Sequence, residues 1–171
     1  IGNAVLQAVN GDGGTMTARD LAAFKVRETA PLTSNFMGKT LVMMPPPSSG
    51  GIVIAQALEM LELRREQLAA ATHNGPEYVH LVTEALKHGF ADRSRRMGDP
   101  EFVNVPTDAL LAPAYIKARA DLFDPARTLT HDRYGTSPAD QPDAVLPEDH
   151  GTSHLSVLDA RGNAVACTET I

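Results

Sequence analysis

Residues 151–171 read GTSHLSVLDARGNAVACTETI. This stretch contains two runs of strand-like composition, 152–159 and 163–171, which are joined by Ala-Arg-Gly. A three-residue loop with Gly162 in the left-handed conformation would connect these runs as a β-hairpin. The sequence therefore predicts two antiparallel strands at its carboxyl end.

In this hairpin Thr152 would lie opposite Thr170, and Thr168 would share a face with Thr170. Facing threonines also occur in sheets for stability alone, so the pair has a structural as well as a functional interpretation. A threonine hydroxyl is a weak nucleophile, but a cut just before the residue frees its α-amino group as a nearby base. The Thr152 hydroxyl could make that cut by attacking the carbonyl of Gly151, because glycine tolerates a strained backbone.

Upstream of the hairpin, the chain turns polar and rich in proline from about residue 124, without any periodicity. This composition predicts an extended linker or an exposed loop before the hairpin. We place the linker at 128–151 and regard 1–127 and 152–171 as the regions that it joins. Periodicity and capping signals in 1–127 predict helices at 1–11, 17–24, 52–66 and 74–99, one or two short helices at 108–123, and a hairpin or meander around Met37-Gly38.

Two helices are expected to form the core. The sequence PPPSSGG at 45–51 predicts a tight strand-to-helix turn before the first of them, whose apolar stripe is Ile54, Ala57, Leu58 and Leu61. The second would begin with Asn74 as N-cap and Pro76 in its first turn. Its expected buried face is Tyr78, Leu81, Val82, Ala85, Leu86 and Phe90. On the same helix, His80 and His88 are expected to be surface or hydrogen-bonded residues. The stretch RSRR at 93–96 is expected to be a solvated helix end.

The composition of the 171 residues is that of a globular protein, with 43% hydrophobic and 21% charged residues. A net charge of −6 without a basic run argues against a nucleic-acid partner. No apolar run approaches 18 residues, so no membrane segment is expected. The single cysteine, Cys167, lies in an apolar run and is expected to be a buried, inert thiol. The chain begins with Ile and has no visible signal peptide, so its amino end looks cut and its compartment is unknown.

Four stretches resemble the γ-glutamyltranspeptidase family of N-terminal-nucleophile hydrolases. They are GGTMTARDLAAFKVRETAPL, MPPPSSGGIVIAQALEMLE, EALKHGFADRSRRMGDP and GTSHLSVLDARGNAVACTETI, in the order and approximate spacing of the family. The resemblance implies an α+β fold, a partial αββα sandwich in which antiparallel strands pack against helices. It also implies that the precursor cuts itself between Gly151 and Thr152, so that 1–127 is the end of a large subunit and Thr152 heads a small one.

The resemblance assigns catalytic positions to Thr152, Thr168 and Thr170. Thr152 matches the nucleophile, Thr170 the residue that orients it, and Thr168 a second threonine beside it, whereas His154 and Ser156 match positions near the cut without an assigned step. The implied partners are a γ-glutamyl substrate such as glutathione, an amino-acid or water acceptor, and the remaining segments of both subunits. The implied chemistry needs no cofactor and no metal.

Some parts of the family pattern are expected outside this chain, namely the carboxylate clamp, the small-subunit Asp, the Ser pair and the oxyanion hole. We therefore expect 1–171 alone to be inactive, with the Gly151–Thr152 bond intact. Ser153 and Glu169 differ from many relatives, which leaves the substrate open between glutathione, poly-γ-glutamate and cephalosporin amides. Two other interpretations are a non-catalytic structural fragment and, less favoured, a metal site of Asp149, His150 and His154.

Overall fold

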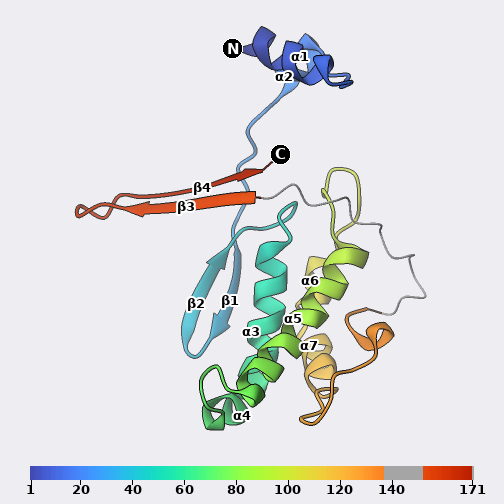
Figure 1. The fold of residues 1–171 in the computed structure, drawn as a ribbon, viewed down its shortest axis with the longest axis vertical. Coiled ribbons are helices and arrows are strands. Elements are labelled where there is room, and N and C mark those ends of the chain that lie inside the picture. Colours follow the sequence, from blue (N-terminus) through green and yellow to red (C-terminus); the bar gives the residue numbers. More distant parts are fainter. Residues whose placement is uncertain (137–151, 171) are drawn as a thin grey trace. The chain divides into compact units, whose positions relative to one another are not determined.

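The computed structural model describes residues 1–136 and 152–170. Helices and short antiparallel strands make up these parts of the chain, which confirms the expected mixture of helix and strand (Figure 1). The chain divides into two compact units, Ile1–Pro31 and Leu32–Ile171.

The first unit contains the helices α1 (Gly2–Gly11) and α2 (Ala18–Ala23). The predicted capping box at the start of α2 is confirmed, since the Thr17 side chain accepts a hydrogen bond from the Asp20 N–H and the Asp20 carboxylate accepts one from the Thr17 N–H. Hydrogen bonds from Thr17 lower the pKa of Asp20. Neither helix has a buried residue, so local capping is what defines α2.

The second unit begins with a hairpin of β1 (Leu32–Phe36) and β2 (Lys39–Met43). Its two-residue turn is Met37-Gly38, and both residues have positive φ, 49° and 73°. Two positive φ angles match the turn that follows the natural twist of a hairpin. The expected strands around Met37-Gly38 are therefore confirmed, and the Ser34 hydroxyl donates to Glu59 of the following helix at 2.5 Å.

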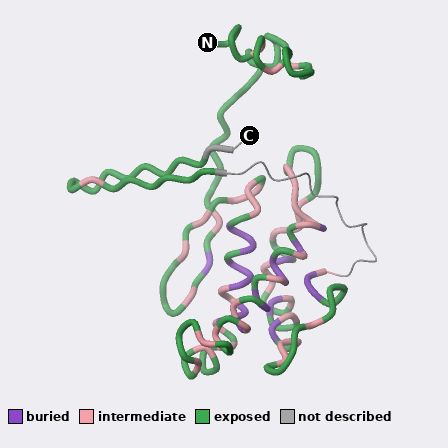
Figure 2. The backbone as a smooth tube through the Cα atoms, viewed as in Figure 1, coloured by how far each residue is buried: buried purple, intermediate pink, exposed green. Residues whose placement is uncertain are grey.

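The helical core is formed by α3 (Gly50–Leu63), α5 (Pro76–Arg96) and α7 (Pro113–Ala120). Buried residues follow the lengths of α3 and α5 in Figure 2. The two helices approach closely at Gly89, where a Cβ atom would lie only 3.0 Å from Val53 Cγ1. The apolar cluster comprises Ala57, Met60, Leu61, Leu81, Ala85, Ile116 and Ala120. Shorter elements complete the unit: α4 (Arg65–Ala70), α6 (Thr107–Leu110), the 3-10 helix η1 (His131–Arg133), β3 (Thr152–Leu158) and β4 (Ala164–Thr170).

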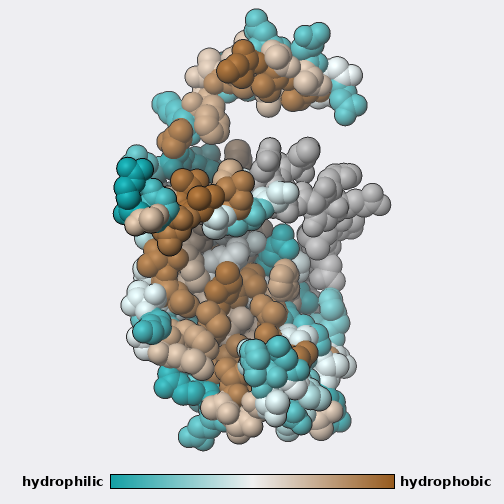
Figure 3. Space-filling view, turned by 60° about the vertical axis from the view of Figure 1, so that its left-hand side comes forward, coloured by the Kyte–Doolittle hydropathy of each residue, from teal (hydrophilic) through white to brown (hydrophobic). Residues whose placement is uncertain are grey.

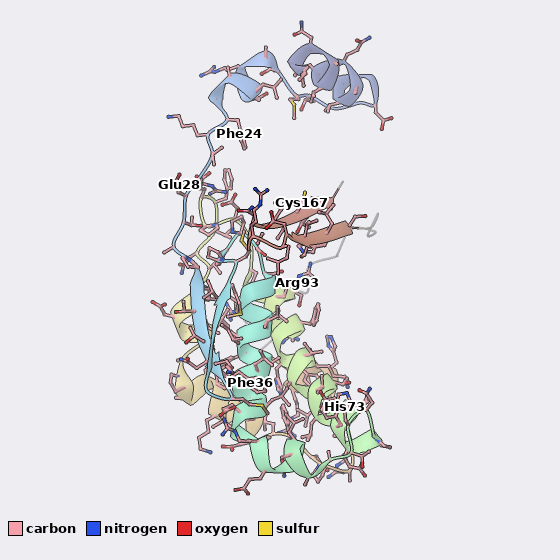
Figure 4. All side chains as sticks on the ribbon, turned by 90° about the vertical axis from the view of Figure 1, so that its left-hand side faces the viewer. Phe24, Glu28, Phe36, His73, Arg93 and Cys167 are labelled. Carbon is pink, nitrogen blue, oxygen red and sulfur yellow. The ribbon has the colours of Figure 1, made fainter. Side chains whose placement is uncertain are left out.

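The PPPSSGG turn leads directly into α3. Gly51 packs against the chain before the turn so closely that a Cβ atom would lie 2.2 Å from the Met44 carbonyl oxygen. Arg93, labelled in Figure 4, donates from Nε to the Ser49 hydroxyl at 3.0 Å and links this turn to the end of α5. The expected strand-to-helix turn is therefore confirmed.

The predicted apolar faces of α3 and α5 are partly wrong. Ile54, Leu86 and Phe90 are 47%, 36% and 52% exposed, although the sequence pattern placed them in the core. Hydrophobic side chains are visible on the surface of this unit in Figure 3. The reason is that the inward positions of both helices include buried polar residues: Gln56, Glu84, His88, Asp92 and Arg95.

Three further expectations are corrected. The N-cap of α5 is Gly75, and Asn74 instead adopts a left-handed conformation with φ of 58°. Arg95 is only 4% exposed, so the RSRR stretch is not simply a solvated helix end. The first part of the expected exposed linker is packed, because Tyr134 is 5% exposed.

Candidate active site

The β3–β4 hairpin has the predicted register. Thr152 pairs with Thr170, and His154 pairs with Thr168. Figure 1 shows β3 and β4 as neighbouring strands of this hairpin. The loop between the strands is closed by an Asp159 N–H that donates to the Asn163 carbonyl at 3.0 Å. Gly162 has φ of +85°, which confirms the left-handed position.

The Asp159 side chain holds this loop. Its carboxylate accepts hydrogen bonds from the Arg161 N–H at 2.8 Å and from the Asn163 N–H at 2.9 Å, and a further one from the Asn163 amide at 2.7 Å. The hydrogen bonds from Asn163, and then those from Arg161, lower the pKa of Asp159. A fixed loop fixes the register, because a slip of one residue would turn every side chain to the opposite face.

Alternation along the strands gives the hairpin two different faces. One face carries Leu155 and Val157 of β3 with their partners Cys167 and Val165 of β4. The other carries His154 and Ser156 with Thr168. The hairpin is therefore amphipathic: His154, Ser156 and Thr168 gather on one face, and the other face is mainly apolar, with Ser153 near its end.

On the polar face, His154 contacts two hydroxyl groups. Its Nδ1 lies 2.7 Å from Thr168 Oγ1, and its Nε2 lies 3.1 Å from Ser156 Oγ. A hydroxyl group can donate or accept, so both contacts can be hydrogen bonds in either tautomer of the imidazole. Sequence reasoning assigned no contact to His154, although its alternation with Thr152 and Ser156 already placed all three on one face.

The backbone positions of the three predicted catalytic threonines lie close together in the hairpin. Thr152 and Thr170 are register partners, and Thr168 is two residues before Thr170 on the same strand. The side chains of Thr152, Glu169 and Thr170 lie outside the described part of the structure, as does Gly151.

The expectation for the cysteine is wrong. Cys167 lies on β4 and is exposed (Figure 4). It belongs to the apolar face of the hairpin, and in the described structure neither face of the hairpin is buried.

Other kinds of site find no support in the described residues. Within 1–136 and 152–170, His, Cys, Asp and Glu side chains form no group that could hold a metal ion. Asp149 and His150 of the alternative metal site lie outside these ranges, so that alternative stays untested. Among the described helices, none combines the length and the apolar character needed to cross a membrane.

A cavity of about 500 Å³ opens in the helical part of the second unit. It is lined by residues of α4, of the first turns of α5 and of the segment after α7, including His80, Leu81, Phe123 and Asp124. His80 Nε2 lies 2.8 Å from the Asp124 carbonyl oxygen, which ties α5 to that segment. The predicted catalytic threonines are not among its lining residues.

Comparison with known proteins identifies the family of the chain. The family model described as gamma-glutamyltranspeptidase matches residues 1–171. The chain is 41% identical over 160 residues to the glutathione hydrolase proenzyme of Pseudomonas aeruginosa, covering 94% of the chain and 27% of that protein. It is 34% identical over 173 residues to the acylase ACY 1 proenzyme of Pseudomonas sp. (strain V22), covering 100% and 29%.

The fold resembles solved structures of the same kind. A gamma-glutamyltranspeptidase from Pseudomonas nitroreducens, complexed with L-DON, matches with a TM-score of 0.72 and 34% identity over 79% of this chain and 41% of that one. Fold, hairpin register and sequence thus define a segment of an N-terminal-nucleophile type of protein. The chain belongs to the γ-glutamyltranspeptidase family. It spans a little over a quarter of the length of the curated relatives that it matches.

Proposed function

We propose that the complete protein containing these residues is a γ-glutamyl hydrolase and transferase that acts on glutathione and related compounds. The observation that carries this proposal is the register of the β3–β4 hairpin, in which Thr152 pairs with Thr170. Membership of the family and relatives named glutathione hydrolase proenzyme support it.

Maturation would be a cut between Gly151 and Thr152. The Thr152 hydroxyl attacks the Gly151 carbonyl carbon, the peptide C–N bond breaks, and an ester forms while the nitrogen becomes a free α-amino group. Water then hydrolyses the ester and leaves a carboxylate on Gly151. The word proenzyme in the names of the relatives supports this step. In this scheme 1–127 ends the large subunit, 128–151 is the linker and 152–171 begins the small subunit.

Turnover would use the same hydroxyl. Thr152 Oγ attacks the γ-carbonyl carbon of the substrate, its proton passes through the freed α-amino group to the leaving amine, and a γ-glutamyl ester of Thr152 forms. Such an amine has a pKa of about 7.7–8.0 in model peptides, close to working pH. Water or the amino group of an acceptor amino acid then takes the acyl group and restores the hydroxyl. Thr170 and Thr168 would orient the nucleophile.

The amphipathic hairpin supports the partial αββα sandwich as the fold of this region. A two-stranded hairpin by itself is only marginally stable in water. Its apolar face, with Leu155 54% exposed, therefore needs a cover that the described residues do not supply. We propose that further strands and helices of the complete protein provide this cover.

A second candidate function is that of an acylase, which would hydrolyse an amide other than a γ-glutamyl amide, such as the amide of a cephalosporin. The specific observation in its favour is the 34% identity to the acylase ACY 1 proenzyme over the whole chain. Both functions use the same nucleophile and differ in the pocket that holds the acyl group. Processing of poly-γ-glutamate is a third substrate choice for the same chemistry.

The test is to mix the complete protein with a chromogenic γ-glutamyl anilide and, separately, with the matching glutaryl anilide, which lacks the α-amino group. Faster release from the γ-glutamyl compound supports the first function, and faster release from the glutaryl compound supports the acylase. Residues 1–171 alone are expected to release neither, because the donors expected for the oxyanion are not among them. Loss of one such donor commonly costs about 2.7–4 kcal/mol of transition-state stabilisation.

A further inference from the structure

Four buried polar residues lie along one side of α5. Glu84, His88 and Asp92 are 0% exposed and Arg95 is 4% exposed, and their spacing of four, four and three residues places them on one helical stripe. We call them the α5 polar row. Charged residues are almost never fully buried unless they are paired, because removing a charge from water is costly. The row must therefore have partners elsewhere in the unit.

Most of these partners come from one segment, residues 128–136, which we call the strap. At its start, the Glu84 carboxylate accepts a hydrogen bond from the Thr128 hydroxyl at 2.6 Å and another from the Tyr134 hydroxyl at 2.7 Å. The Tyr134 oxygen in turn accepts the Leu129 N–H at 3.0 Å. Burial alone would raise the pKa of Glu84, but the hydrogen bonds from Thr128, Tyr134 and Lys87 outweigh it and lower the pKa.

At the end of the strap, the polar row binds the backbone itself. The Gly135 N–H donates to His88 Nδ1 at 3.0 Å, and the Thr136 N–H donates to the Asp92 carboxylate at 2.6 Å. Arg95 donates from Nη1 to the carbonyl oxygens of Tyr134 and Thr136. The N–H groups of Gly135 and Thr136 and the carbonyl groups of Tyr134 and Thr136 are thus each hydrogen-bonded to a buried side chain.

The Gly135 carbonyl is also bound, since it accepts a hydrogen bond from Arg119 of α7 at 2.8 Å. Gly135 has φ of +63°, and a Cβ atom there would lie 2.7 Å from an Asp92 carboxylate oxygen. Only glycine fits this position without strain. Side-chain partners, backbone partners and a required glycine together make the strap a built docking interaction.

We propose that the α5 polar row is a retention site for the end of the large fragment. After the cut at Gly151–Thr152, the chain up to Thr136 would stay docked on α5. The proposal rests on the cut described under the proposed function. Its physical reason is that release of the strap would remove the Gly135 N–H from His88, two hydroxyl donors from Glu84 and the Thr136 N–H from Asp92. Glu84 would keep only Lys87, and Asp92 would keep only Gln56 and Tyr115, among the hydrogen bonds described. Because such groups are expensive to leave unpaired, the strap stays docked and preserves the packing of α3, α5 and α7 in the mature protein.

The first experiment measures trypsin cleavage after Arg133 in the complete protein carrying Tyr134→Phe. This change removes the hydroxyl that binds Glu84 and keeps the ring. Loss of a hydrogen bond to a charged group should raise the population of the open strap about ten- to hundredfold. Cleavage after Arg133 should become faster by the same factor, because trypsin cuts the open form. Thr128→Val, which removes the other hydroxyl on Glu84, is a second variant with the same expected direction.

Tyr115→Phe is the matched control. The Tyr115 hydroxyl also donates to a buried carboxylate, Asp92, at 2.6 Å, but Tyr115 belongs to α7 and not to the strap. We expect this control to leave cleavage after Arg133 within about threefold of the unmodified protein. Equal acceleration by Tyr115→Phe and Tyr134→Phe would overturn the proposal, because the strap would then open only together with the whole core.

The second experiment compares hydrogen exchange at the Gly135 and Thr136 amides in the cut protein and in an uncut Thr152→Ala protein. Equal protection in both supports retention, and protection that is lost on cutting overturns it. If the unmodified protein is never cut, the proposed function fails on that result. The trypsin comparison then still decides whether the polar row holds the strap, so the two failures are distinguishable.

Discussion

Thr152 and Thr170 are register partners across the β3–β4 hairpin, eighteen residues apart in sequence and directly opposite in the ladder. Directly opposed residues in an antiparallel pair have Cβ atoms about 4.5–5.5 Å apart, within reach of a hydrogen bond between their side chains. This relationship is what the proposed chemistry needs from the hairpin, and it yields a direct prediction.

In the complete protein, Thr152→Ala should abolish both the cut at Gly151 and turnover. Thr170→Val keeps the shape of the side chain but removes its hydroxyl, and it should slow both steps about tenfold, the effect of losing one hydrogen bond. Mass spectrometry of the fragments and anilide release measure the two steps. Ser153→Ala is the control, since Ser153 neighbours Thr152 on the other face, and it should change either rate by no more than about twofold. A Thr152→Ala protein that still splits at this bond would show that Thr152 is not the nucleophile.

The contact between His154 and Thr168 predicts a positioning role for the histidine. His154→Ala should lower kcat about tenfold and leave KM unchanged, because in this prediction the histidine acts by orienting the Thr168 hydroxyl and not by binding the substrate. His154→Asn should restore most of the activity, since its amide occupies the place of Nδ1 beside Thr168. If the alanine and asparagine variants are equally slow, the contact with Thr168 is not what the histidine supplies.

The hairpin could be predicted from sequence because its determinants are local. Alternation, a glycine in the loop and Asp159 three residues before it fix strands, turn and register within twenty residues. The same holds for the capping box of Thr17 and Asp20. Cys167 was mistaken for a buried residue because alternation indicates which face is apolar but not whether anything covers it.

The buried face of α5 could not be predicted in the same way. Leu86 and Phe90 suggested an apolar stripe, but the inward side carries His88 and Asp92. A strap some forty residues later supplies most of the partners of these buried polar residues, and a search for apolar periodicity does not detect such pairing. The regular spacing of Glu84, His88 and Asp92 was the available signal.

The paired glycines that begin α3 yield a prediction that sequence alone does not provide. At Gly51 a Cβ atom would lie 2.2 Å from the Met44 carbonyl oxygen, whereas at Gly50 the nearest contact is the Ser48 hydroxyl at 3.8 Å. Gly51→Ala should therefore destabilise the complete protein by about 3 kcal/mol or more, since the backbone must move. Gly50→Ala should be neutral or slightly stabilising, because alanine favours a helix.

Chemical denaturation of both variants measures this difference. The two substitutions are the same, one residue apart, and so differ only in their surroundings. Equal stability of the two variants would mean that the chain around Met44 does not approach α3 as closely as described.

Protonation of His88 should loosen the end of the strap at mildly acidic pH. Burial is the main cause that lowers the pKa of His88 to about 4, and the positive charge of Arg119 adds to it, while Asp92 and Glu84 act in the opposite direction. The rings of Tyr134 and Phe123 also pack against the imidazole, at centroid distances of 5.0 and 5.8 Å. The neutral form is the one that accepts the Gly135 N–H at Nδ1.

Because the pKa of His88 is lower in the folded protein than the usual value of about 6.5, the unfolded chain binds the extra proton first. The stability contributed by neutral His88 is thus complete above about pH 6.5 and is lost as the pH falls toward 4, roughly 3 kcal/mol in all. Burial acts to raise the pKa of Glu84, but hydrogen bonds from Thr128, Tyr134 and Lys87 outweigh burial and lower this pKa, so this carboxylate takes up its proton at a lower pH than an ordinary glutamate. Protection of the Gly135 amide against hydrogen exchange, corrected for intrinsic rates, should therefore fall between pH 6.5 and 4.

The control is His88→Asn, whose side chain can still accept this N–H but does not titrate. Protection of the Gly135 amide in this variant should therefore stay constant over the same pH range. A flat profile in the unmodified protein would show that His88 does not hold the strap in its neutral form.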